Sequence, residues 1–282
     1  MSVTRRGMLA GAAALVVGCR DDARGGGRGG GERAVSLSPS TTEAMFAIGA
    51  GAFLVGRSDH CDHPREALAL PKVGGFASPN LERVLSLRPT VVIGSQSPVG
   101  PALEEQLRGH GIDTLFPPTR SVAEILTMMQ ILGTRFGMAD GARRAGRRVE
   151  RKLNAIAQWT ASRKRPRVVM VFDPQPLFVA GPGSFADELI GRAGGENAIH
   201  EGGQWPTIDE ERLLALDPDV IVDASMAGGD SRLGTRPGWA DVRAVKEGNV
   251  RALHTDAALR PGPRIGEGVR DLAAAIHGVT PT

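Results

Sequence analysis

Short apolar runs alternate with helix-like patterns through most of the chain. In the first half, these patterns predict strands at 34–38, 53–56, 90–94 and 113–116, and helices near 41–48, 81–87, 101–109 and 122–136. In the second half, they predict strands at 167–172, 177–180, 220–223 and 249–253, and helices at 184–193, 210–216 and 264–276. This alternation indicates an α/β fold whose parallel sheets are covered by helices.

One segment of the chain occurs twice. Residues 82–93 (ERVLSLRPTVVI) and 211–222 (ERLLALDPDVIV) are identical at six of twelve positions, at an offset of 129 residues. Each copy predicts a short helix that ends before a proline, followed by a buried strand. Such a unit also recurs in unrelated α/β proteins. However, an aromatic residue lies six positions before each glutamate, Phe76 and Trp205, which favours two similar lobes.

A long amphipathic helix is predicted between the two copies. Over residues 139–163, apolar positions recur at three- and four-residue steps and oppose a heavily charged face, which we interpret as solvated. At ~1.5 Å per residue the helix is roughly 37 Å long, and Arg165-Pro166 ends it. A single connecting helix predicts a stiff bridge with limited hinge motion. The predicted body therefore has an N-terminal lobe (34–138), a bridging helix (139–164) and a C-terminal lobe (165–282), with a ligand cleft between the lobes.

The N-terminus has the pattern of an export signal. In residues 1–18, Arg5-Arg6 precedes an apolar run that is too short to span a bilayer. The adjacent arginine pair resembles that of a twin-arginine export signal. Val16-Val17-Gly18-Cys19 resembles the lipobox of bacterial lipoproteins, in which the cysteine is lipidated; the alternative is a cleaved signal with an incidental cysteine. Residues 19–33 are rich in glycine and predict a flexible tether with a reach of roughly 20 Å. These features predict an extracytoplasmic protein held at a membrane by Cys19.

The amino-acid composition, the charge and the missing motifs argue against several classes of function. The chain has 282 residues, 41% of them hydrophobic and 23% charged, as expected for a folded protein. The formal net charge is +3, but the segment before residue 34 contributes all of it, so the body is neutral and nucleic acid is a disfavoured partner. Two cysteines exclude a disulfide scaffold and a four-cysteine zinc site. No Walker A, H-E-x-x-H or G-x-S-x-G motif is present, so the sequence does not predict an enzyme.

Several stretches carry a resemblance to a known family. They are RAVSLSPSTTE (33–43), VGRSDHCDHP (55–64), LPKVG (70–74), PNLE (79–82), GGEN (194–197), Trp205-Pro206 and Pro263-Arg264-Ile265. Together they resemble the class of ABC-importer binding proteins that carry cobalamin, haem and ferric siderophores, and above all its cobalamin-binding members. The resemblance implies two α/β lobes joined by one helix. It also implies delivery of a corrinoid, as transported ligand and not as cofactor, by a monomer to a permease dimer with its ATPase.

The same resemblance implies a set of ligand-binding residues. They are Pro39, Ser40, His60, Asp62, Phe76, Phe172, Trp205, Asp256 and Arg260. Aromatic faces cover apolar ring surface, while carboxylates and arginine meet peripheral amides. The sequence departs from the family at three positions, because His60 and His63 stand where tyrosines are common and Phe76 stands where tryptophan is found.

Glu82 and Glu211 match the two docking glutamates of the family, one in each lobe. A binding protein with two similar lobes can present one charge to each half of a twofold-symmetric permease. The alternative is that both are ordinary acids at helix N-termini, stabilised by the helix dipole.

Four alternatives remain open. His60-Cys61-Asp62-His63 offers metal-ligand chemistry, but we expect no structural metal there, because residues this close in an extended loop rarely all face one ion. The second alternative is that His60 coordinates the cobalt of a corrinoid. We expect Cys61 to be a plain buried cysteine. A haem or ferric-siderophore binder is the nearest rival function, although the chain has no tyrosine to ligate haem. A secreted, membrane-tethered hydrolase or sensor is the rival from a different class.

Overall fold

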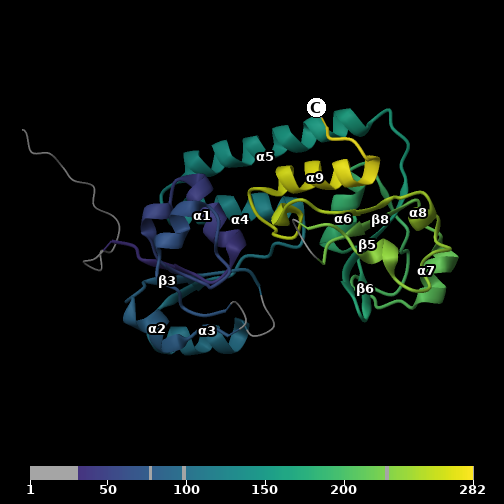
Figure 1. The fold of residues 1–282 in the computed structure, drawn as a ribbon. Helices are drawn as coiled ribbons and strands as arrows, with labels where there is room; N and C mark the ends of the chain where they lie inside the picture. Colours follow the sequence, from purple (N-terminus) through teal and green to yellow (C-terminus); the bar gives the residue numbers. More distant parts are fainter. Residues whose placement is uncertain (1–30, 76–77, 97–99, 226–228, 282) are drawn as a thin grey trace, which may run out of the picture. The chain divides into compact units, whose positions relative to one another are not determined.

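Two separate sheets, each built from its own half of the chain, form the framework of the protein (Figure 1). The structure is a computed structural model that describes residues 31–75, 78–96, 100–225 and 229–281. Within this part, no helix has both the length and the apolar character needed to cross a bilayer.

The first sheet is parallel throughout, with strand order β2-β1-β3-β4. Its strands are β1 (Ala34–Ser36), β2 (Leu54–Arg57), β3 (Val91–Ile93) and β4 (Asp113–Leu115). Helices α1 (Pro39–Ile48) and α4 (Val122–Arg135) pack on the face that carries Val91 and Ile93. Helices α2 (Leu81–Ser86) and α3 (Gly100–Gly109) cover the face that carries Val92. Because both of its faces are buried, the central strand β3 is continuously apolar, as predicted.

The second sheet has the same layering, with strand order β6-β5-β8-β9 and β7 also paired to β5. Its strands are β5 (Arg167–Pro174), β6 (Leu177–Val179), β7 (Glu196–Asn197), β8 (Val220–Asp223) and β9 (Val250–Ala252). One face, with Val220 and Val222, is covered by α6 (Phe185–Arg192) and α9 (Ile265–His277). The other face, with Ile221, is covered by α7 (Glu210–Leu216) and α8 (Arg243–Lys246). Short 3-10 helices lie at Gly51–Phe53, Arg65–Ala69, Leu233–Thr235 and Asp256–Ala258.

Strand β6 departs from the parallel arrangement, since it pairs antiparallel with β5. Only Gln175 and Pro176 separate these two strands. A connection of two residues can join only antiparallel neighbours, because a parallel crossover needs a dozen residues or more. The parallel α/β core is confirmed, and this hairpin is a local exception at the sheet edge.

The duplicated segment has the same backbone conformation in both lobes. The side chain of Asn80 accepts a hydrogen bond from the Arg83 amide at the start of α2, and Asp209 does the same for Arg212 at the start of α7. Each segment then has a left-handed residue before its proline, with φ of 48° at Arg88 and 41° at Asp217. The strands that follow, β3 and β8, each lie between two other strands of their sheet.

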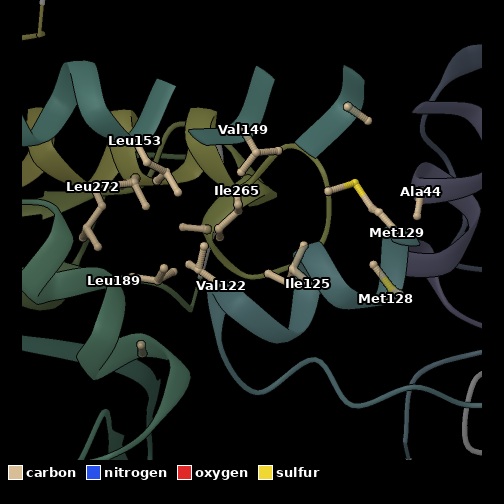
Figure 2. Close-up of a cluster of buried hydrophobic side chains, with 14 of the residues drawn as sticks. Ala44, Val122, Ile125, Met128, Met129, Val149, Leu153, Leu189, Ile265 and Leu272 are labelled. Carbon is tan, nitrogen blue, oxygen red and sulfur yellow. The ribbon is translucent and has the colours of Figure 1, made fainter. Parts of the chain in front are cut away.

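Both lobes share one hydrophobic core beneath helix α5 (Ala139–Thr160). The buried side of α5 contributes Val149 and Leu153, which meet Ile125 of α4 and Leu272 of α9 (Figure 2). The same cluster continues to Ala44 of α1 and to Leu189 of α6, so it reaches the inner helices of both sheets (Figure 2). The bridge is therefore packed along its length, as a stiff connection requires.

Helix α5 ends at Thr160, three residues before the predicted end. Its last turn tightens there, because the Arg163 amide donates to the Thr160 carbonyl at 3.0 Å. The Arg163 guanidinium then stacks over the Trp159 ring at 3.6 Å.

The close approach of α1 and α5 depends on Gly141. A β-carbon at this position would lie 1.8 Å from the Ile48 carbonyl oxygen, whereas one at Gly146, on the same helix, would meet only a Leu126 methyl group at 3.8 Å. We predict that Gly141→Ala destabilises the protein by about 1–3 kcal/mol through overpacking. Gly146→Ala, the matched control, should be neutral or stabilise by up to ~1 kcal/mol. Urea unfolding measures both, and equal effects would contradict the tight contact.

Candidate functional site

Most of the predicted binding residues lie at or shortly after the carboxyl ends of parallel strands. Pro39 and Ser40 follow β1, and His60 and Asp62 follow β2. In the second sheet, Phe172 lies near the end of β5, while Asp256 and Arg260 follow β9. Ligands of α/β folds bind at this edge of the sheet.

Hydroxyl groups fix the start of α1, which carries Pro39 and Ser40. Ser38 caps α1, and its Oγ lies 2.9 Å from Thr41 Oγ1 and 3.1 Å from Ser95 Oγ. Pro39 occupies the first turn of α1, where its missing N–H costs nothing. Ser40 is buried, and its backbone packs against Gly262 of the other lobe, where a β-carbon would lie 3.4 Å from Ser40 Cα.

A buried ion pair joins the two lobes next to this loop. Arg264 donates from Nε and Nη2 to the two carboxylate oxygens of Glu43, at 2.9 and 2.7 Å. The side chain of Glu43 is only 2% exposed. Arg264 Nη2 also donates to Asp256 at 3.1 Å. The hydrogen bonds to Glu43 raise the pKa of Arg264, so the guanidinium stays charged.

Three of the predicted residues meet in the same network. Arg260 pairs with Asp256 at 2.7 Å and, across the lobes, donates to Asp62 through both terminal nitrogens. Arg260 Nη1 also lies 3.7 Å from Glu43 Oε1. The hydrogen bond from Arg260 lowers the pKa of Asp62 and raises that of Arg260. Asp62 remains 58% exposed, so this end of the network is open to solvent.

The network has more carboxylates than cations. Glu43, Asp62 and Asp256 carry three negative charges against two on Arg260 and Arg264. Each guanidinium already contacts at least two carboxylates. The cluster can therefore offer hydrogen bonds to polar neutral groups, but it has no surplus positive charge for an anion.

An exposed aromatic group is built on the second sheet. The ring centroid of Trp205 lies 5.1 Å from that of Phe172, edge to face, and 6.0 Å from that of Phe178, nearly parallel. The Trp205 loop is tied to β6, because the Gly181 amide donates to the Gln204 carbonyl at 2.9 Å and the Val179 amide to the Pro206 carbonyl at 3.1 Å. Trp205 nevertheless remains 41% exposed, which leaves a large apolar surface for a partner.

Of the other residues singled out from the sequence, some are described by the structure and some lie outside the described part. His60 and His63 are exposed, while Cys61 is buried with its Sγ 3.1 Å from Ser58 Oγ. No group of three or more potential metal ligands comes together in the described part of the chain. Phe76 and Cys19 lie outside the described residues, so their predicted roles stay predictions.

Glu82 and Glu211 occupy equivalent places in the two lobes. Each is the second residue of its helix, α2 or α7, and each is exposed. Neither has an ion-pair partner among the described residues. Their helices lie on the sheet faces turned away from the core beneath α5. The geometry thus presents an unpaired carboxylate at the same position of the repeated segment in each lobe.

Three residues of this region were not assigned a role from the sequence. Glu43 and Arg264 stand in motifs that carry the family resemblance, and a glutamate among buried residues of α1 signals a need for a cationic partner. Phe178 carries no such signal, because its position beside Trp205 depends on the pairing of β6 with residue 207.

Sequence comparison matches residues 35–257 to a family described as periplasmic binding protein. The chain belongs to this family. Its members act outside the cytoplasm as substrate-binding components of transport systems, so the chain is a transport component and not an enzyme. The prediction of the bilobal α/β class is confirmed.

Three similar proteins show the breadth of the class. The uncharacterised ABC transporter substrate-binding lipoprotein YvrC of Bacillus subtilis is 28% identical over 87% of this chain and 80% of its own length. The vitamin B12-binding protein of Salmonella paratyphi A is 29% identical over 88% of this chain and 91% of its own. The apo structure of the periplasmic haem-binding protein RhuT from Roseiflexus sp. RS-1 has a TM-score of 0.77 at 28% identity, covering 88% and 99% of the two chains.

Proposed function

We propose that this periplasmic binding protein captures cobalamin or a related corrinoid between its lobes and delivers it unchanged to an ABC importer. The charge balance of the interlobe network carries this proposal. Its two arginines are neutralised by three carboxylates, so the site suits a ligand whose rim consists of neutral amides. A corrinoid has such a rim, and amides can both donate to the carboxylates and accept from the guanidinium groups.

The aromatic group around Trp205 supplies the apolar contacts that we propose for the ligand. A corrin ring has a broad face with apolar edges, and Trp205 with Phe172 and Phe178 offers an exposed aromatic surface on the second sheet. Aromatic contact provides area, and the network provides orientation. Phe76, six residues before Glu82 as Trp205 is before Glu211, is the residue we propose for the corresponding position in the first lobe.

Haem is the second candidate ligand. The similarity to a haem-binding protein favours it, and the exposed His60 and His63 could ligate iron. Against it, the two propionates of haem would require cations that Arg260 and Arg264, already paired, do not supply. The chain also has no tyrosine as an alternative iron ligand.

We further propose that Glu82 and Glu211 contact the permease and that Cys19 anchors the chain. An exposed carboxylate at the same place in each lobe suits a twofold-symmetric membrane partner, and such charges orient an encounter more than they add affinity. The signal-like N-terminus and the lipobox-like sequence before Cys19 support a lipid anchor with a flexible tether.

Calorimetric titration tests the ligand. We predict saturable one-to-one binding of cyanocobalamin and no comparable heat with haemin. Trp205→Ala should weaken corrinoid binding by about 10- to 100-fold, as expected for a central aromatic anchor. Leu214→Ala, which removes a similarly exposed apolar side chain from α7, should leave it unchanged. Tight haemin binding without a cyanocobalamin signal would overturn the proposal.

Docking is tested separately by replacing both glutamates. We predict that Glu82→Gln with Glu211→Gln leaves the corrinoid affinity intact and abolishes uptake into cells that express the cognate permease and ATPase. The control replaces two exposed glutamates elsewhere, Glu105→Gln with Glu196→Gln, and should transport normally. Uptake by the double variant at the control rate would contradict the docking role.

A further inference from the structure

The chain concentrates its positive charge on helix α5 and the turn that follows it. Residues 139–165 contain nine arginines and lysines against two acids, Asp140 and Glu150. The whole of residues 34–282 is neutral, so the rest of the body carries a compensating negative excess. The charge is therefore strongly segregated, which a solvated surface does not require.

Three arginines form the centre of this basic face. Arg144, Arg147 and Arg151 are exposed and, at 100° per residue, lie opposite the side of α5 that buries Val149 and Leu153. None of the three has a carboxylate partner among the described residues. Other cations at the edges of the face are engaged, since Arg148 donates to the Ala47 carbonyl at 3.0 Å and Lys152 pairs with Glu267 at 2.7 Å.

Helix α5 also contains pairs of arginines at a spacing that destabilises a helix. Arg144 and Arg148, like Arg147 and Arg151, stand four residues apart, a spacing at which like charges repel along a helix. A solvated helix commonly places glutamates at such positions to form favourable pairs. An anionic partner would remove this repulsion, so the pattern indicates a negatively charged surface.

The place where the described body begins indicates which surface this is. Glu32, where the described body follows the N-terminal segment, pairs with Arg135 at 3.3 Å, and Arg135 lies only four residues before the start of α5. The described body therefore begins, at Glu32, near the first turn of α5. In Figure 1, α5 runs along the top of the ribbon, whereas α2 and α3 lie at the bottom.

We propose that the basic face of α5, centred on Arg144, Arg147 and Arg151, binds the anionic phospholipid headgroups of the membrane that carries the lipid anchor. This inference rests on the proposed anchoring, but not on the identity of the ligand. Because Glu82 and Glu211 lie on the sheet faces turned away from the core beneath α5, a molecule resting on this face leaves both carboxylates in solvent. Membrane-bound and permease-docked molecules then have different orientations.

Vesicle sedimentation tests the proposal with the full chain carrying Cys19→Ser, so that no acyl group contributes. We expect binding to phosphatidylglycerol vesicles, little binding to phosphatidylcholine vesicles, and loss of binding at 0.5 M salt, where surface charges are screened. Arg144→Gln, Arg147→Gln and Arg151→Gln together should weaken binding about 100-fold, as expected when three cations leave an anionic bilayer.

The matched control places the same charge change on other exposed arginines, Arg83→Gln, Arg108→Gln and Arg232→Gln, and should bind anionic vesicles like the parent chain. The α5 variant should unfold no earlier than the parent and bind cyanocobalamin equally well. Equal vesicle binding by both triple variants, equal binding to both lipids, or binding to single-stranded DNA but not to vesicles would each overturn the proposal. Failure of corrinoid binding with lipid binding intact would overturn the ligand assignment alone.

Discussion

A single hydrophobic core beneath α5 determines how the two lobes relate to each other. Val149 and Leu153 of α5 contact helices of both lobes, so separating the lobes would expose apolar surface from α1, α4, α6 and α9 together. Each fully buried leucine or valine contributes roughly 1.5–3 kcal/mol, and several would be exposed at once. The lobes therefore behave as one body, although each has its own sheet.

This constraint also fixes the relative position of the residues that we propose as part of the binding site. The loops of β1 and β2 face those of β9 across a fixed interface, where Glu43 and Arg264 form a buried two-point ion pair. Such a pair adds orientation more than stability, because desolvation offsets much of the attraction. Arg260 and Asp62 extend it towards solvent, and Trp205 with Phe172 is the separate aromatic part of the site that we propose.

Much of this architecture could be predicted from the sequence. The duplicated segment predicted two equivalent helix–strand units, and the matching left-handed residues Arg88 and Asp217 confirm it in backbone detail. Periodicity predicted α5, but not its early end, because the tight turn in which the Arg163 amide donates to the Thr160 carbonyl leaves no mark on the pattern of apolar positions. The predicted residues Asp62, Asp256 and Arg260 come together, as do Phe172 and Trp205. Their partners Glu43, Arg264 and Phe178 were not assigned, because each acts through a contact between segments distant in the chain.

Native-state hydrogen exchange in increasing urea tests the shared core most directly. The central strands β3 and β8 belong to different sheets, and a common core predicts that their slowest amides open with the same free energy and the same urea dependence. Opening of one sheet at clearly lower free energy, with a smaller urea slope than the other, would show that the lobes unfold separately and would contradict the account.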